Sequence, residues 1–216
     1  MFKGIIFDLD GTLLDTVETI AYYGNKSLEK YGFKPIDSEI YKYMAGNGAK
    51  HLVKSMLAES GSSDPEMFEK VFKDYNIAYN TDTLYKTEVY DGIKDLIAVA
   101  KEKGLKLAVL SNKPHDATVD VIDKFFEEGT FDLCYGAREG IPLKPDATSA
   151  VMLAKEMGFE KDECIYVGDT NVDMQTGKSA GFYTVGVLWG FRDRKELEDN
   201  GADMIVSKPM EILTLI

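Results

Sequence analysis

The chain has 216 residues, which is enough for one large domain or two small ones. Its formal net charge of −12 argues against nucleic acid and anionic membranes as partners, because both bind a basic protein face. No apolar run approaches the roughly 18 residues of a membrane span, and Asp8 interrupts the first run too early for a signal peptide. We therefore expect a cytoplasmic protein.

The first predicted strand, GIIFDL at 4–9, leads directly into two carboxylates, Asp8 and Asp10, before the chain turns at Gly11. An unpaired buried charge is costly or shifts its pKa, and two carboxylates this close repel each other. We expect a positive group between them, or a proton on one of them.

Residues 16–85 show helical spacing and no strand pattern. This block is too long for a connection, so it predicts a small all-helical domain inserted after the first strand. The predicted main domain then consists of residues 1–15 and 86–216.

From residue 90 onward, short apolar runs alternate with helical patterns. The strands predicted there span residues 105–112, 131–137, 163–169, 183–189 and 202–207. Such alternation is typical of a parallel sheet that is buried on both faces. The sequence therefore predicts an α/β fold, a Rossmann-like parallel sheet with helices on both faces.

Polar side chains recur where these strands end. In chain order they are Asp8 and Asp10, Ser111 and Asn112, Lys144, and Asp169 and Asp173. The carboxyl ends of parallel strands meet at one edge of a sheet and form its ligand crevice. Four separate segments therefore predict one site that combines acids, a hydroxyl group and a lysine.

Three other motifs each lack a required residue. The segment DTNVDMQTGKSA has Met174 and Ala180 where a calcium loop needs Gly and Glu. The GKS at 177–179 has Val172 in place of the earlier glycine of a nucleotide-binding loop, and the GNG at 46–48 lacks the third glycine of a dinucleotide fingerprint.

The segments FDLDGTLLDT, LSNK, LKPD and VGDTNVD resemble, in order and position, the four motifs of the haloacid dehalogenase superfamily. The helical insertion is similar to the cap domain of that superfamily. The tail, GVLWGFRDRKEL and GADMIVSKPMEIL, resembles the phosphoglycolate phosphatase branch, as does SNKP. One departure is Ala147, where relatives often carry proline, and we expect it to affect only the start of the next helix.

The resemblance implies that Asp8 is a nucleophile that forms an aspartyl-phosphate. Asp10 would be the acid/base, which protonates the leaving oxygen and then activates water. This second acid distinguishes the phosphatases from the dehalogenases. Main-chain amides near Leu9 and Asp10 would cradle the phosphate oxygens.

Ser111 and the amide of Asn112 would hydrogen-bond the transferring phosphoryl group, although a strand-end cap is the favoured interpretation of Ser111 taken alone. Lys144 would pair with Asp8 and the phosphate and neutralise charge in the transition state. A lysine that precedes a proline usually lies in a solvated turn, so only the position of Lys144 after the third strand favours a catalytic role. Lys113 would be a peripheral positive group or a solvent-facing lysine, the second being favoured.

The resemblance also implies Mg²⁺, which would relieve the repulsion between a carboxylate nucleophile and a phosphate. The implied ligands are Asp8, the main-chain carbonyl of Asp10, and Asp169. Asp173, four residues on, would share a helical face with Asp169. It would bind the metal or support the ligands, the second being favoured, and capping the helix is a further alternative.

In the cap, the segment GNGAKH at 46–51 interrupts the helical pattern and is expected to fold over the active site as a loop. Candidate substrate contacts are Asn47, Lys50 and His51. Each has the alternative of an ordinary loop or helix-surface residue, which is favoured for His51. The cap would move on hinges near residues 15–17 and 83–90.

We interpret the sequence as a Mg²⁺-dependent phosphatase of a small phosphorylated metabolite, with phosphoglycolate as the leading candidate, acting as a monomer or weak homodimer. Alternatives are a pyrophosphatase of the same branch and a sugar phosphomutase. The mutase is disfavoured by Thr12 and Leu13, because related mutases tend to carry DGVI. A non-catalytic binding protein is also an alternative, which the complete set of motif residues argues against.

Overall fold

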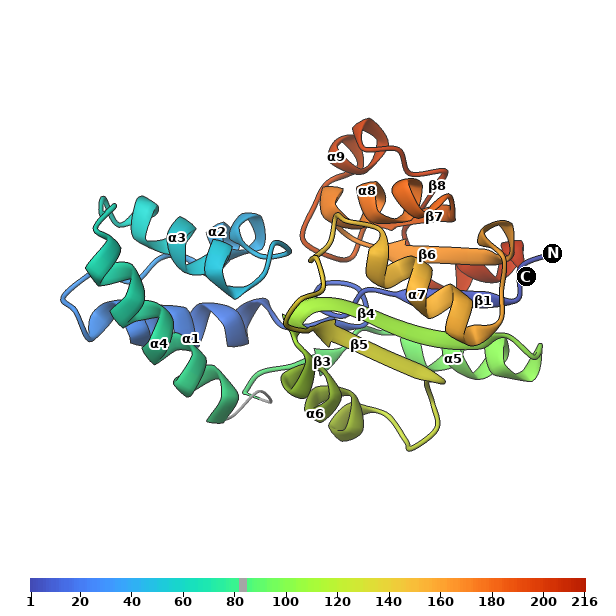
Figure 1. Ribbon diagram of the computed structural model, residues 1–216, viewed down its shortest axis with the longest axis horizontal. Helices are drawn as coiled ribbons and strands as arrows, with labels where there is room; N and C mark the ends of the chain where they lie inside the picture. The colour runs from blue at the N-terminus through green and yellow to red at the C-terminus, as the bar shows by residue number, and fades with distance from the viewer. Residues whose placement is uncertain (82–84) are drawn as a thin grey trace. The chain divides into compact units, whose positions relative to one another are not determined.

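The computed structural model describes residues 1–81 and 85–216 (Figure 1). The chain forms two compact units, a larger one made of Met1–Asp15 and Val89–Ile216 and a smaller one made of Thr16–Glu88. Residues 83 and 84, where the second predicted hinge begins, lie outside the described residues. Within the described ranges, no helix has both the length and the apolar character needed to span a membrane.

The larger unit is built on a six-stranded parallel sheet in the order β5-β4-β1-β6-β7-β8. Its strands are β1 (Gly4–Phe7), β4 (Lys106–Pro114), β5 (Leu133–Ala137), β6 (Cys164–Gly168), β7 (Tyr183–Val187) and β8 (Met204–Val206). Strand β1 lies between β4 and β6, so the ends of these three strands are neighbours. The predicted parallel α/β sheet is confirmed.

Helices cover both faces of this sheet (Figure 1). They are α5 (Ile93–Glu102), α6 (His115–Phe125), α7 (Thr148–Met157), α8 (Asn171–Ala180) and α9 (Arg194–Asp199), with 3₁₀ turns η1 (Lys161–Glu163) and η2 (Pro209–Leu215). Successive strand side chains alternate between the faces. In β1, Ile5 therefore packs in one core with Leu96 of α5, whereas Ile6 packs in the other with Leu153 of α7.

Strand β4 extends two residues beyond its predicted end at 112. Its pairing with β5 shifts register between Leu110 and Pro114. Ser111 and Asn112 therefore lie in an irregular stretch inside the strand, two residues before its end, whereas the sequence analysis placed them at its end. Strand β1 ends earlier than predicted, at Phe7, so Asp8 directly follows it.

The smaller unit contains, within the described ranges, the helices α1 (Val17–Glu29), α2 (Ser38–Met44), α3 (Ala49–Glu59) and α4 (Pro65–Thr81). Its core includes the fully buried side chains of Tyr41, Val53, Met56 and Val71. Two short strands, β2 (Leu14–Asp15) and β3 (Glu88–Val89), pair where the chain passes between the units. The helices predicted for residues 16–85 are present as α1 to α4.

Candidate active site

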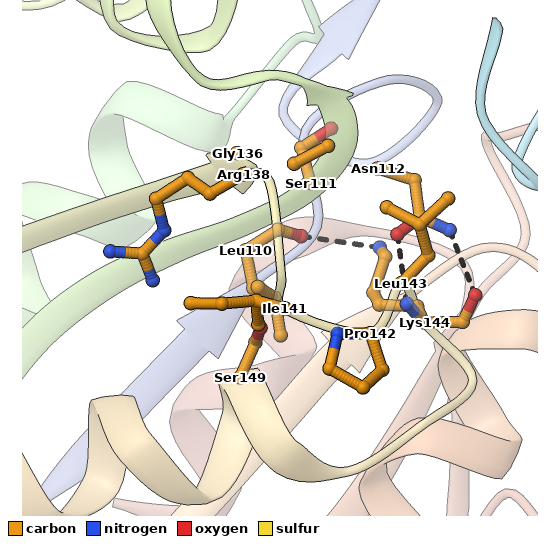
Figure 2. A pocket seen from close by; sticks show the side chains of 11 residues that line it. Leu110, Ser111, Asn112, Gly136, Arg138, Ile141, Pro142, Leu143, Lys144 and Ser149 are labelled. Carbon is orange, nitrogen blue, oxygen red and sulfur yellow. Dashed lines mark hydrogen bonds between the residues drawn. The ribbon is translucent and has the colours of Figure 1, made fainter.

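Lys144 reaches back from the loop after β5 and joins two acids. Its ammonium nitrogen donates to Asp8 Oδ1 at 2.6 Å and to Asp173 Oδ1 at 2.7 Å. It also donates to the carbonyl oxygen of Leu110 in β4 at 3.2 Å (Figure 2). The Lys144 side chain is only 3% exposed, and these bonds give each of its three hydrogens an acceptor, as a buried ammonium requires. The expected pairing of Lys144 with Asp8 is present.

Asp169 follows β6 directly and is fully buried. One carboxylate oxygen accepts from Thr12 Oγ1 at 3.1 Å, and the other accepts from the amide of Phe191 at 2.8 Å. Gly11 has a φ of +88°, and a Cβ there would lie 2.2 Å from Asp169 Oδ2. The turn after Asp10 therefore needs glycine both for its backbone conformation and for space.

Asp173 lies in the first turn of α8, where it forms a capping box with Thr170. Thr170 Oγ1 donates to Asp173 Oδ2 at 2.6 Å, and the hydroxyl of Tyr166 donates to Oδ1 at 3.3 Å. The expectation that Asp173 shares a helical face with Asp169 is wrong, because α8 begins at Asn171 and Asp169 precedes it. These bonds to Thr170 match the helix-capping alternative for Asp173.

Three buried acids nevertheless converge. One oxygen each of Asp8, Asp169 and Asp173 lies within 4.8 Å of the others. The pKa of Asp8 is raised to about 7, first by burial and then by the charge of Asp173, while the nearby Lys144 ammonium opposes the shift. Burial also raises the pKa of Asp169, as do the charges of Asp173 and Asp8.

One ammonium cannot balance three carboxylates, so this donor set fits a hard divalent cation that prefers oxygen ligands, such as Mg²⁺. The carboxylate of Asp10 is outside the group of converging oxygens. This is consistent with the expectation that only its main-chain carbonyl would reach the metal.

Lys113 is the clearest correction to the sequence analysis. It was expected to face solvent, but its side chain is 4% exposed and its ammonium donates to Asp10 Oδ1 at 2.6 Å. Lys113 lies in the stretch of β4 where the pairing with β5 shifts register, so regular strand alternation does not fix the direction of its side chain. Its place in the segment LSNK, directly after Ser111 and Asn112, was the signal in the sequence that could have identified it.

Ser111 and Leu9 are also buried. Ser111 Oγ accepts from the amide of Lys113 at 3.1 Å, a local bond that matches the strand-cap alternative. The Leu9 side chain is in the core, and its carbonyl accepts from the amide of Leu13 at 3.0 Å in the turn. The phosphate contacts predicted for both residues stay predictions.

Asn112 uses its side chain for a contact that the sequence analysis missed. Its Oδ1 accepts from the amide of Lys144 at 2.9 Å, and its Nδ2 donates to the carbonyl of Lys144 at 3.0 Å (Figure 2). The prediction for Asn112 concerned only its main-chain amide. No sequence pattern links these two residues, which are 32 positions apart.

The cap candidates lie in the smaller unit. Asn47 is half-buried between α2 and α3, whereas Lys50 and His51 are exposed in the first turn of α3. Gly48, with a φ of +82°, is the N-cap of that helix. The predicted loop therefore ends at Gly48, and Lys50 and His51 are helical residues, which corrects the expectation that they lie in a loop.

The sequence matches define the class of protein to which this fold and this acid–lysine cluster belong. A sequence model of haloacid dehalogenase-like hydrolases matches residues 5–187, and the chain belongs to this family. A phosphoglycolate phosphatase of Aquifex aeolicus is 31% identical to the chain over 98% of its length and 95% of the relative's. These matches confirm the predicted family, its phosphoglycolate phosphatase-like branch and the expectation of an enzyme of the phosphatase type.

Solved structures agree with this assignment. One from Lactobacillus delbrueckii subsp. bulgaricus, provisionally assigned as a phosphoglycolate phosphatase, has a TM-score of 0.94 and 30% identity, and the match covers 100% of this chain and 98% of that one. A β-phosphoglucomutase from Clostridium difficile has a TM-score of 0.79 and 21% identity over 98% and 93% of the two chains. The second match shows a shared fold only, so the fold by itself does not separate phosphatase from mutase.

Proposed function

We propose that this protein is a Mg²⁺-dependent phosphatase that hydrolyses a small phosphorylated metabolite through a phosphorylated Asp8. The observation that carries the proposal is the 2.6 Å contact of the Lys144 ammonium with Asp8, beside the buried acids Asp169 and Asp173. A carboxylate, a fixed cation and spare oxygen donors are the groups that phosphoryl transfer to a protein carboxylate requires.

In the first step, an oxygen of Asp8 bonds to phosphorus as the bond to the leaving oxygen breaks. Asp10 donates a proton to that oxygen. In the second step, Asp10 takes a proton from water, which attacks phosphorus and releases inorganic phosphate and free Asp8. Lys144 stays paired with Asp8 and offsets the charge that develops on the phosphoryl oxygens.

The residues that would hold Mg²⁺ are Asp8, Asp169 and the main-chain carbonyl of Asp10, with Asp173 as their support. When bound, the ion neutralises charge on the nucleophile and on the phosphate. Asp173 is better suited to support than to direct binding, because one of its oxygens is held by the positively charged Lys144 ammonium and the other by Thr170. The oxygens of Asp169 accept from a neutral hydroxyl and a neutral amide, which leave its negative charge available to a cation.

Phosphoglycolate is the proposed substrate, supported by the similarity to the Aquifex aeolicus phosphatase. We propose that Asn47, Lys50 and His51 contribute to the choice of substrate, and that Ser111 and the amides of Leu9 and Asn112 contact the phosphoryl group. No observation favours pyrophosphate or a mutase reaction. The cytoplasmic location and the monomeric or weakly dimeric state stay predictions.

The test is an assay of released phosphate with p-nitrophenyl phosphate, phosphoglycolate and pyrophosphate, each with Mg²⁺ and with excess chelator. We expect Mg²⁺-dependent hydrolysis, with phosphoglycolate preferred over pyrophosphate. Beryllofluoride should bind the parent protein at Asp8 and should not bind Asp8→Asn. Hydrolysis that persists unchanged in Asp8→Asn would refute the proposed mechanism.

A further inference from the structure

Strand β4 holds Lys144 at two points. The side-chain amide of Asn112 bonds both the N–H and the C=O of Lys144, and the carbonyl of Leu110 accepts from the Lys144 ammonium (Figure 2). Leu110 and Asn112 are two residues apart in the strand. The backbone of Lys144 and its side-chain ammonium are therefore both hydrogen-bonded to the same short stretch of β4.

The contacts made by Asn112 are strong ones by geometry. Both distances, 2.9 and 3.0 Å, are those of good N–H···O bonds, and an amide side chain offers the donor and the acceptor that a backbone unit needs. Asn112 is only 7% exposed and Lys144 5%, so water does not readily replace these bonds.

We infer that Asn112 is a positioning residue, which sets the place of the Lys144 ammonium by holding the Lys144 backbone. The inference rests on the proposed function for its catalytic consequence. Lys144 comes from the loop between β5 and α7, and its ammonium serves Asp8 only if the backbone of this loop stays in register with β4. A displacement of about 1 Å in such a group can cost about 10²-fold in rate.

The chain contains a matched control. In the smaller unit, Asn25 makes the same paired contact with a backbone, because its Oδ1 accepts from the amide of Ile36 and its Nδ2 donates to the carbonyl of Ile36, both at 2.8 Å. Asn25→Ala therefore removes an equivalent pair of bonds from a backbone segment that carries none of the proposed catalytic groups. It also removes a bond from the Tyr41 hydroxyl to Asn25 Oδ1 at 2.9 Å, so this control is at least as disruptive locally as Asn112→Ala.

The first measurement is hydrogen exchange of backbone amides by NMR in parent protein, Asn112→Ala and Asn25→Ala. In Asn112→Ala, protection of the Lys144 amide should fall at least about tenfold, while protection in β1 is unchanged. In Asn25→Ala, the Ile36 amide should lose protection and the Lys144 amide should keep it. Unchanged protection of Lys144 in Asn112→Ala would overturn the inference, whether or not the protein is a phosphatase.

The second measurement is turnover of p-nitrophenyl phosphate with Mg²⁺. Asn112→Ala should lower kcat by about 10–100-fold and change KM by less than about threefold, whereas Asn25→Ala should keep kcat within about twofold. The same substitution is then made in Lys144→Met, or in Lys144→Gln where the Met variant does not fold. With no ammonium to position, loss of Asn112 should have no further effect on kcat.

If the losses from Asn112→Ala and Lys144→Met multiply instead, Asn112 acts on the substrate directly and the inference is wrong. If the parent protein hydrolyses none of the phosphate esters, the proposed function fails, and the exchange of the Lys144 amide alone decides whether Asn112 holds this residue.

Discussion

Two lysines at the candidate site of the larger unit differ from the cap candidate Lys50 of the smaller unit in what surrounds them. Lys144 is 3% exposed on its side chain and bonds two carboxylates and a carbonyl, and Lys113 is 4% exposed and bonds Asp10. Lys50, in the first turn of α3, is exposed, as is His51 beside it. A buried charged group is costly unless it has partners, so the contacts of Lys144 and Lys113 indicate what these residues do. An exposed lysine needs no protein partner, so the role of Lys50 can be tested only by the effect of its substitution on substrate use.

The largest expected effect is that of Asp8→Asn. Asn has nearly the same shape as Asp but is a poor nucleophile, so kcat should fall by at least about 10⁴-fold with Mg²⁺ present. Circular dichroism should show an intact fold, because the substitution removes a buried charge. Near-normal turnover would mean that the buried acids of the larger unit do not carry the reaction.

Removal of the metal should have the second largest effect on turnover. Chelator should abolish turnover and added Mg²⁺ should restore it, because Asp8, Asp169 and Asp173 leave excess negative charge around one lysine. Ca²⁺ should inhibit, since it takes more ligands and can bind both oxygens of Asp8. Full activity in excess chelator would contradict the assignment of these acids to a metal site.

Lys144→Ala tests whether loss of a buried lysine lowers the free energy of unfolding more than loss of an exposed one. It leaves two buried carboxylates without their cation and should lower the free energy of unfolding by about 3–5 kcal/mol. The matched change Lys178→Ala breaks an ion pair with Asp203 at 2.8 Å, but Lys178 is 45% exposed, so we expect a loss of about 0–1 kcal/mol. Equal losses in urea titrations would remove the distinction between the two kinds of lysine.

The pH dependence of stability in chelator should reflect the buried acids. The folded protein holds a proton on Asp8 with a pKa of about 7, whereas the unfolded chain releases it near the ordinary value of 3.8. The free energy of unfolding should therefore fall as the pH rises from about 4 to about 7, and Asp169 should act in the same direction.

Urea titrations in chelator across this range measure the slope. Asp8→Asn has no proton to release, so its slope should be shallower than that of the parent protein. An equal slope in both proteins would show that Asp8 does not titrate in this way.

The smallest effect is expected from the exposed candidates. Lys50→Ala or His51→Ala should change kcat/KM unequally among phosphoglycolate, pyrophosphate and p-nitrophenyl phosphate, by factors of about ten to a few hundred for the charged substrates. Mg²⁺ dependence should persist. Lys70→Ala, an exposed lysine in α4, is the control and should change none of the three constants. If every variant keeps the original ratios, these residues do not select the substrate.

The fold class and the principal acids could be predicted from the sequence because both are local patterns. Strand and helix periodicity identified a parallel sheet, and the polar residues at strand ends indicated that Asp8, Lys144, Asp169 and Asp173 would meet. The edge of a parallel sheet brings strand ends together whatever the intervening segments contain. The substrate contacts of the cap have no such geometric rule behind them.

Tertiary structure decided which of these groups touch. Lys113 pairs with Asp10 across 103 positions, Asn112 holds Lys144 across 32, and the amide of Phe191 reaches Asp169 across 22. Each bond depends on the register of β4 or on the turn after a strand, and a shift of one residue in a strand would point its side chains to the other face. The sequence by itself determined which chemical groups this protein brings to one edge of its sheet. Only the packed fold decided their pairing, because burial leaves each charge no partner other than the groups that packing places beside it.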